Sequence, residues 1–182
     1  MNYIDTTIPD VKIIEPNVFG DERGFFMETF RVDEFNKHCS PRAFVQDNHS
    51  KSSHGILRGL HYQMKSTQGK LVRVTSGEVY DVAVDMRKSS TTFGQHVGVI
   101  LSGDNKRQLW VPEGFAHGFY VMSESAEFVY KCTDYYAPKH EVSLLWNDPE
   151  LNIKWPFIDG KSPSLSSKDE AGILFKDAPY FL

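Results

Sequence analysis

Two of the seven histidines stand in surroundings that suit chemistry. His61 lies in the run LRGLHYQ and His117 in PEGFAHGFY, so each has glycine and aromatic neighbours in a strand-like segment. An imidazole in an apolar strand must either be satisfied by a partner or take part in a reaction, and its ordinary pKa lies close to neutral pH. For one such histidine the structural interpretation is the simpler one. For two near glycine-rich strand ends, both interpretations stay open.

The segment Pro112–His117 resembles the second motif of metal-binding β-barrels of the cupin type. The first motif of such barrels needs two histidines one residue apart and a glutamate soon after. Here the corresponding place reads His61-Tyr62-Gln63, and the next glutamate is Glu78. Transition metals at such sites require three or four nitrogen, oxygen or sulfur ligands. We therefore expect no bound metal, and a free imidazole can act as a base.

A tyrosine is the next candidate, because it can donate a proton. In the run FVYKC, strand alternation puts Phe128, Tyr130 and Cys132 on one face and Lys131 on the other. Since Lys131 should reach water, Tyr130 should point inward. A buried tyrosine is most often a packing residue with its hydroxyl bonded, so the pattern alone leaves packing and catalysis open.

Three basic residues, Arg23, Arg58 and Lys70, stand among glycines and apolar strand residues. Each alone is an ordinary ion-pair partner. Together they could hold an anion such as a diphosphate, because arginine offers a planar bidentate fork. Neither a Walker loop nor a G-x-G-x-x-G run is present, so the sequence does not indicate ATP hydrolysis or a dinucleotide cofactor.

Size and composition limit the alternatives. The 182 residues fit a single domain, residues 1–182. Lysine and arginine number 20 against 24 acidic residues, a net charge of −4, which disfavours nucleic acid as a partner. No apolar run is long enough for a transmembrane helix, and the start MNYIDTTIPD does not resemble an export signal. Cys39 and Cys132 stand in no C-x-x-C pattern, so we expect free, buried thiols and a cytoplasmic protein.

Short strand-like runs separated by turn residues predict an all-β, antiparallel sandwich or barrel. Only Val32–His38 looks helical near the N-terminus, and short helical turns are expected around Lys168–Phe175. Alternation is clearest after the turn Ser76-Gly77. The predicted strands are Val11–Pro16, Gly24–Phe30, Ala43–His49, Ile56–Tyr62, Lys70–Thr75, Val79–Met86, His96–Leu101, Gln108–Val111, Gly118–Met122, Glu127–Tyr135 and Val142–Trp146.

A series of motifs along essentially the whole chain makes the sequence similar to the family of dTDP-4-dehydrorhamnose 3,5-epimerases. The resemblance implies a cupin-type jelly roll, usually a homodimer, that works without a cofactor. It implies dTDP-4-dehydro-6-deoxy-D-glucose as substrate, in the synthesis of dTDP-L-rhamnose. The motifs that carry it are GDERGFF (20–26), QDNHS (46–50), LRGLHYQ (57–63), GKLVRV (69–74), GEVYDVAVD (77–85), WVPEGFAHGF (110–119), Tyr130-Lys131, WNDP (146–149) and LSSKD (165–169).

The resemblance also implies roles for single residues. His61 is expected to be the base, with Asp169 as its orienting partner. Tyr130 is expected to be the acid, most plainly at C5, and Lys70 to stabilise the enolate oxygen. The residues expected to line the substrate site are Arg23, Phe26, Glu28, Gln46, Asp47, Asn48, Arg58, Lys70, His117, Glu141 and Lys168.

These roles fit general acid–base chemistry. The C4 ketone acidifies the hydrogens at C3 and C5, so a base can form an enolate that is reprotonated on the opposite face. Two alternatives stay open: an epimerase that acts only at C3 or only at C5, and a non-catalytic jelly roll that binds a nucleotide sugar.

One point conflicts with simple strand geometry. Arg58 and His61 are three residues apart, so strict alternation would put them on opposite faces. A β-bulge at Gly59 could bring both to the same site.

Overall fold

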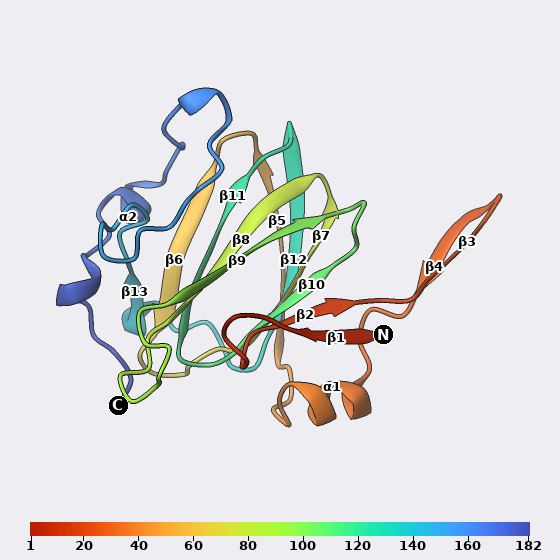
Figure 1. Ribbon diagram of the computed structural model, residues 1–182, viewed down its shortest axis with the longest axis horizontal. Coiled ribbons are helices and arrows are strands. Elements are labelled where there is room, and N and C mark those ends of the chain that lie inside the picture. The colour runs from red at the N-terminus through yellow and green to blue at the C-terminus, as the bar shows by residue number, and fades with distance from the viewer.

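The computed structural model describes residues 1–182, except the side chain at position 159. Two sheets, each with antiparallel neighbours, pack face to face (Figure 1). This architecture confirms the predicted all-β, antiparallel sandwich. One sheet has the order β1 (Asn2–Asp5), β2 (Lys12–Glu15), β10 (Gln108–Val111), β7 (Lys70–Ser76), β12 (Ser125–Cys132) and β5 (Gln46–Ser53). The other has the order β13 (Glu141–Ser143), β6 (Leu57–Gln63), β11 (Phe115–Val121), β8 (Glu78–Asp85) and β9 (His96–Ser102).

The predicted elements agree with the structure where the local pattern is strong. Helix α1 covers Val32–His38 and β10 covers Gln108–Val111, both as predicted. The tail forms α2 (Ser167–Glu170) and the 3-10 turn η3 (Phe175–Asp177), close to the predicted helical turns. Two further 3-10 turns are η1 (Pro138–His140) and η2 (Ile158–Gly160).

The largest differences concern short strands and strand ends. Strand β1 was not predicted, because it has four residues and is defined by its pairing with β2, ten positions along the chain. Strand β5 starts three residues later than predicted and β12 ends three residues earlier. Such ends are set by where the neighbouring strand stops, which local composition does not encode.

The turn at Ser76-Gly77 carries the chain from one sheet to the other, since β7 and β8 belong to different sheets. Gly77 has φ +79°, and a Cβ atom there would lie 2.0 Å from the carbonyl oxygen of Ser125. Glycine is therefore required by both the backbone conformation and the space.

The side chains of β8 are buried on both faces of its sheet. Val79 and Ala83 belong to the core between the sheets, whereas Val82 and Val84 pack under the C-terminal segment. The C-terminal segment contributes Trp155 among others to that outer layer. The tail after β13 is thus a structural cover for the five-stranded sheet.

Helix α1 covers part of the other sheet. Phe35 is its buried residue, and its ring meets Trp110 edge-on with centroids 5.0 Å apart. The part of the chain that the structure describes has no helix long and apolar enough to cross a membrane.

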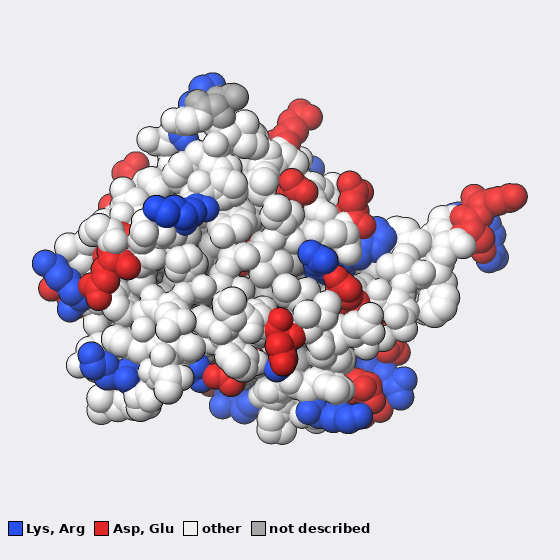
Figure 2. Space-filling model, in the orientation of Figure 1, with Lys and Arg blue, Asp and Glu red and all other residues white. Residues whose placement is uncertain are grey.

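A two-stranded arm, β3 (Val18–Asp21) and β4 (Gly24–Met27), projects from the sandwich (Figure 1). β3 was not predicted, and β4 stops three residues before its predicted end. Its tip carries charges of both signs (Figure 2), while Phe19 and Phe26 on its strands are 66% and 72% exposed. An isolated hairpin is marginally stable, and such exposed aromatic side chains mark an interaction surface.

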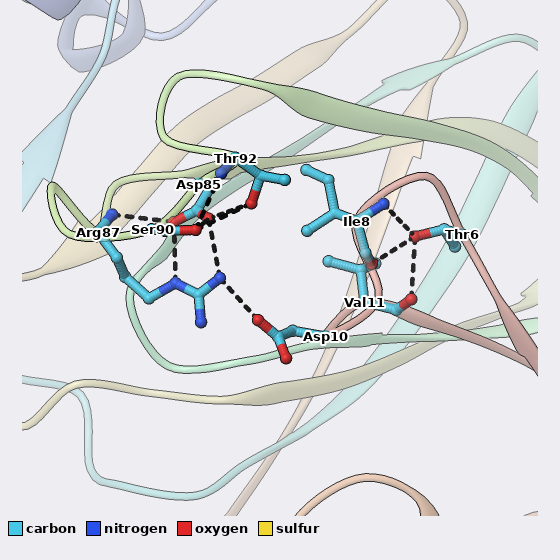
Figure 3. Close-up of polar contacts among 8 residues, drawn as sticks. All are labelled: Thr6, Ile8, Asp10, Val11, Asp85, Arg87, Ser90 and Thr92. Atoms are coloured by element: carbon cyan, nitrogen blue, oxygen red, sulfur yellow. Dashed lines mark hydrogen bonds and ion pairs between the residues drawn. The ribbon is translucent and has the colours of Figure 1, made fainter.

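A buried carboxylate fixes the loop after β8 (Figure 3). Asp85 accepts hydrogen bonds from Nε and Nη2 of Arg87 (2.9 and 2.8 Å) and from the hydroxyls of Ser90 and Thr92 (both 2.7 Å). Arg87 also pairs with Asp10 at 2.8 Å, which joins this loop to the N-terminal segment. Burial alone would raise the pKa of Asp85, but the hydrogen bonds from Arg87, Ser90 and Thr92 outweigh it and lower that pKa.

The N-terminal segment is closed by a turn of its own in the same region (Figure 3). The hydroxyl of Thr6 donates to the carbonyl oxygens of Ile8 (2.8 Å) and Val11 (3.0 Å). Ile8 and Val11 insert into the core between the sheets. The Asp85 network therefore ties a core-forming segment to the loop after β8.

Replacing Asp85 by asparagine should destabilise the fold by about 3 kcal/mol, because it leaves buried donors and the Arg87 guanidinium without their carboxylate. Urea denaturation followed by tryptophan fluorescence measures the loss. The exposed Asp104 provides the control, and Asp104→Asn should change stability by less than about 0.5 kcal/mol. Equal stabilities for the two variants would contradict the role given to the network.

Candidate active site

A cavity of about 400 Å³ opens between the two sheets. The five-stranded sheet supplies one wall through β6 and β11, and the six-stranded sheet supplies the other through β5, β7 and β12. Strand β13, helix α2 and the loop before η1 form the rim. The lining residues are Gln46, Asn48, Ser50, Arg58, His61, Gln68, Lys70, His117, Gly118, Phe119, Phe128, Tyr130, Tyr136, Glu141, Ser166, Lys168 and Asp169.

His61 on β6 is held by a carboxylate from helix α2. Its Nε2 lies 2.5 Å from Oδ1 of Asp169, which is buried. The hydroxyl of Ser166, the N-cap of α2, donates to Oδ2 of Asp169 at 2.7 Å. Burial raises the pKa of Asp169, but the hydrogen bonds from His61 and Ser166 outweigh this and lower it, so the group is a carboxylate.

This pair fixes the tautomer of the imidazole. A carboxylate only accepts hydrogen bonds, so Nε2 of His61 must carry a proton toward Asp169. In neutral His61 the lone pair then belongs to Nδ1. That nitrogen lies 4.0 Å from Oε1 of Glu141, at the rim. Nδ1 is therefore the atom of His61 that can take a proton in the cavity.

The bulge expected at Gly59 is present. His117 faces His61 in the register and Phe119 faces Arg58, so two residues of β6 stand opposite one of β11. Gly59 has φ +125°, and a Cβ atom there would lie 2.5 Å from Cα of Gly118. The extra residue turns Arg58 and His61 to the same side, and both line the cavity.

The second histidine of interest, His117, has its own aspartate. Its Nε2 lies 3.0 Å from both carboxylate oxygens of Asp81 on β8, which is completely buried. His61 and His117 are thus register neighbours, and each is bound to a different carboxylate. Among the described residues, no three His, Cys, Asp or Glu side chains are grouped to hold a metal. The metal-free reaction stays a prediction.

Tyr130 on β12 faces the cavity from the opposite wall. Lys131, its neighbour, lies on the outer face and pairs with Asp47, as the alternation predicted. Burial, followed by the charges of Cys132 and Glu141, raises the pKa of Tyr130 to about 12. Its hydroxyl is therefore protonated at neutral pH and can donate.

Lys70 begins β7, the strand that pairs with β12, and it also lines the cavity. Burial lowers its pKa, while the charges of Cys132, Glu141 and Asp81 oppose that shift. A cation in such a site is stabilised when negative charge develops next to it.

Polar side chains from both sheets and the rim complete the cavity. Arg58 is fixed by a hydrogen bond from its Nε to the hydroxyl of Ser52 at 2.9 Å. Gln46 and Asn48 point inward from alternate positions of β5, with Nε2 of Gln46 donating to Oδ1 of Asn48 at 3.1 Å. Lys168 at the rim donates to Oε2 of Glu141 at 2.9 Å.

Four of the expected site residues lie elsewhere. Asp47 is on the outer face of its sheet, because β5 alternates and Gln46 and Asn48 take the inner positions. Arg23 and Phe26 belong to the projecting arm, and Glu28 follows it directly. None of these four lines the cavity of its own chain.

The cavity also contains residues that the sequence analysis did not single out. Ser50 continues the inward row of Gln46 and Asn48 by two residues, and Ser166 precedes a short helix as an N-cap, so both have a local signal. Gln68 and Tyr136 lie in loops, where no periodic pattern predicts which way a side chain points.

Chemically, the cavity places a carboxylate-bound imidazole on one wall and a protonated phenol on the other. A ring between them can lose a proton to Nδ1 of His61 on one face and receive one from Tyr130 on the opposite face. Lys70 lines the same cavity from the strand next to that of Tyr130, where a cation can stabilise an enolate. Such an arrangement can invert a carbon next to a carbonyl group.

Comparisons with known proteins agree with this geometry. A family model described as dTDP-4-dehydrorhamnose 3,5-epimerase matches residues 5–177. The dTDP-4-dehydrorhamnose 3,5-epimerase of Pseudomonas aeruginosa is 60% identical over 175 residues, 96% of each chain. That of Shigella flexneri is 59% identical over 184 residues and covers 100% of both chains.

A solved structure gives the same result in three dimensions. The dTDP-6-deoxy-D-glucose-3,5-epimerase of Legionella pneumophila, in complex with dTDP-4-keto-L-rhamnose, is 56% identical with a TM-score of 0.94. The match covers 98% of this chain and 94% of that one. Both the sequence and the cupin-type jelly roll are therefore shared along nearly the whole chain, which belongs to the dTDP-4-dehydrorhamnose 3,5-epimerase family.

Proposed function

We propose that this protein converts dTDP-4-dehydro-6-deoxy-D-glucose into dTDP-4-dehydro-L-rhamnose by inverting C3 and C5. The observation that carries the proposal is the placement of His61 and Tyr130 on opposite walls of one cavity. Inversion needs a base and an acid on opposite faces of the sugar ring, and this cavity has both.

Each inversion proceeds in two steps. The C4 ketone acidifies the neighbouring hydrogen, and Nδ1 of His61 removes it to leave an enolate. Lys70 stabilises the negative oxygen at C4. Tyr130 then donates its proton to the same carbon from the other face. The residues require no cofactor for these steps, so the cofactor-free reaction expected from the resemblance stays our prediction.

The nucleotide part of the substrate carries a diphosphate, which needs basic and polar partners. We assign Arg58, Lys168, Gln46 and Asn48 to its binding, supported by their positions around the cavity. An arginine fork matches phosphate oxygens well, and the Ser52 hydrogen bond holds Arg58 in place.

We propose that the protein works as a homodimer in which the arm reaches the cavity of a second copy. Arg23, Phe26 and Glu28 lie on or next to the arm, outside their own cavity, and the aromatic face of the arm is exposed. A second copy accounts for both observations, because it covers the aromatic residues and brings the three side chains to a substrate. The cytoplasmic location expected from the sequence stays a prediction.

Two alternatives are separated by one measurement on the unmodified protein. A 3-only or 5-only epimerase would exchange one ring proton for deuterium, and a binding protein would exchange none. Incubation with the ketosugar nucleotide in D2O, followed by proton NMR at C3 and C5, should show exchange at both positions.

Replacing His61 by asparagine should stop exchange at both C3 and C5, because one base opens both enolates. The expected loss is roughly 10²–10⁴-fold in kcat. Asp169→Asn should lose less, since an amide oxygen can still accept from Nε2 while only the charge is removed. NMR in D2O reads both variants, and full activity of His61→Asn would mean that the base lies elsewhere.

Replacing Tyr130 by phenylalanine removes only the hydroxyl and keeps the ring packed against Phe128. The variant should fold, bind dTDP and still lose protons to His61. Delivery of a proton to the opposite face should fail, most visibly at C5, so exchange or product at C3 should outlast the doubly inverted sugar. Formation of that sugar at the unmodified rate would make Tyr130 a packing residue.

Subunit complementation tests the arm. The double variant Arg23→Ala/Phe26→Ala loses the contacts of the arm, and the variant His61→Asn loses the base. Each variant alone should therefore be nearly inactive. A re-equilibrated equal mixture should regain roughly a quarter of the activity, since half of the dimers are mixed and each mixed dimer has one intact site. A monomeric protein, or a mixture that stays inactive, would contradict the shared site.

A further inference from the structure

The double inversion of the proposed function, on which this inference rests, raises a problem of proton balance. Each inversion leaves an extra proton on His61 and a missing proton on Tyr130. The second inversion cannot begin until His61 has lost its proton and Tyr130 has regained one. Some route must therefore carry protons from the base toward solvent while the sugar occupies the cavity.

Glu141 on β13 lies at the start of such a route. Its Oε1 is 4.0 Å from Nδ1 of His61, the nitrogen that receives the substrate proton. The other nitrogen, Nε2, is occupied by Asp169. A separation of 4.0 Å can be closed by a small side-chain rotation or bridged by one water molecule.

The second carboxylate oxygen of Glu141 is hydrogen-bonded to residues at the protein surface. Oε2 accepts hydrogen bonds from the hydroxyl of Tyr136 (3.0 Å) and from Nζ of Lys168 (2.9 Å). The Glu141 side chain is 14% exposed, whereas Lys168 is 49% exposed and Tyr136 52%. One oxygen of the Glu141 carboxylate thus lies near Nδ1 of His61, and the other is hydrogen-bonded to two exposed side chains.

Glu141 is an ionised carboxylate, so it is unprotonated when His61 receives the substrate proton and readily passes on a proton that it takes up. Burial raises the pKa of Glu141, but the Lys168 hydrogen bond and the charges of His61 and Lys168 outweigh it and lower that pKa. The carboxylate also contributes to the raised pKa of Tyr130, after burial and Cys132, so it acts electrostatically on the acid across the cavity.

We propose that Glu141 is a proton relay that resets His61 between the two inversions. The Nδ1–H bond of the imidazolium breaks and an O–H bond forms on Glu141. That proton then passes to solvent at the rim beside Tyr136. A solvent proton restores the O–H bond of Tyr130, so the cycle closes with no net change of charge or electrons.

The test uses Glu141→Gln, which keeps the size of the side chain but cannot accept the proton. In a single turnover, with the protein in excess over the ketosugar nucleotide in D2O, the second inversion should slow by about 10²-fold relative to the first, because only the second needs a reset base. A singly inverted sugar should therefore accumulate. Glu124→Gln, at an exposed site between β11 and β12, is the matched control and should give the doubly inverted sugar as before.

Chemical rescue provides an independent measurement. In Glu141→Ala, added formate should restore the second inversion in a saturable manner, whereas chloride at the same ionic strength should not. Circular dichroism and dTDP binding establish that both Glu141 variants are folded. If Glu141 only stabilised the structure, freely diffusing formate would not restore the second inversion in Glu141→Ala.

Three outcomes overturn the relay. If the two inversions slow together with a raised KM, Glu141 is a substrate-positioning residue. The relay is also overturned if both inversions continue unchanged in Glu141→Gln, or if formate has no effect on Glu141→Ala. If the unmodified protein exchanges neither proton, the proposed function itself fails, and this result is distinct from the other three.

Discussion

The hydrogen bond between His61 and Asp169 joins residues 108 positions apart, and the rest of the site depends on it. It determines which imidazole nitrogen can act as a base, because Nε2 is occupied by Asp169 and Nδ1 keeps the lone pair. Asp169 can hold this position because Ser166 bonds its second oxygen and caps the helix on which it stands. The carboxylate is thus fixed from both sides.

The C-terminal segment is what brings Asp169 to the cavity. Ile173 exchanges backbone hydrogen bonds with the β13 region: its carbonyl oxygen accepts from the N–H of Leu145 at 2.8 Å, and its N–H donates to the carbonyl oxygen of Ser143 at 2.9 Å. Ser164 accepts from the backbone of Leu57 at the start of β6 (3.0 Å). Because the same segment also covers the outer face of the five-stranded sheet, stability and catalytic geometry share one structural element.

The two-sheet architecture explains why a base and an acid can face each other without touching. Each sheet presents one wall, so His61 and Tyr130 face the cavity from opposite sides. The same enclosure tunes the groups: burial raises the pKa of Tyr130 to about 12 and lowers the pKa of Lys70. Burial thus keeps the phenol a proton donor at neutral pH.

Periodicity in the sequence determined much of this protein. Alternation in FVYKC placed Tyr130 inward and Lys131 outward, and the acidic first turn of Val32–His38 marked the helix. These features are local, since a strand or helix assigns its faces from neighbouring residues alone. Motifs over the whole chain further indicated the family and, through it, the pairing of His61 with Asp169.

Tertiary structure decided which of those faces meet. Nothing local distinguishes Asp47 from its neighbours as a site residue, yet the sheet turns it outward and Gln46 and Asn48 inward. The bulge at Gly59 depends on the close approach of Gly118 on another strand. The distance between His61 and Glu141 exists only because β13 pairs with β6. Such contacts join distant parts of the chain, so only the folded chain defines the route from the base to water.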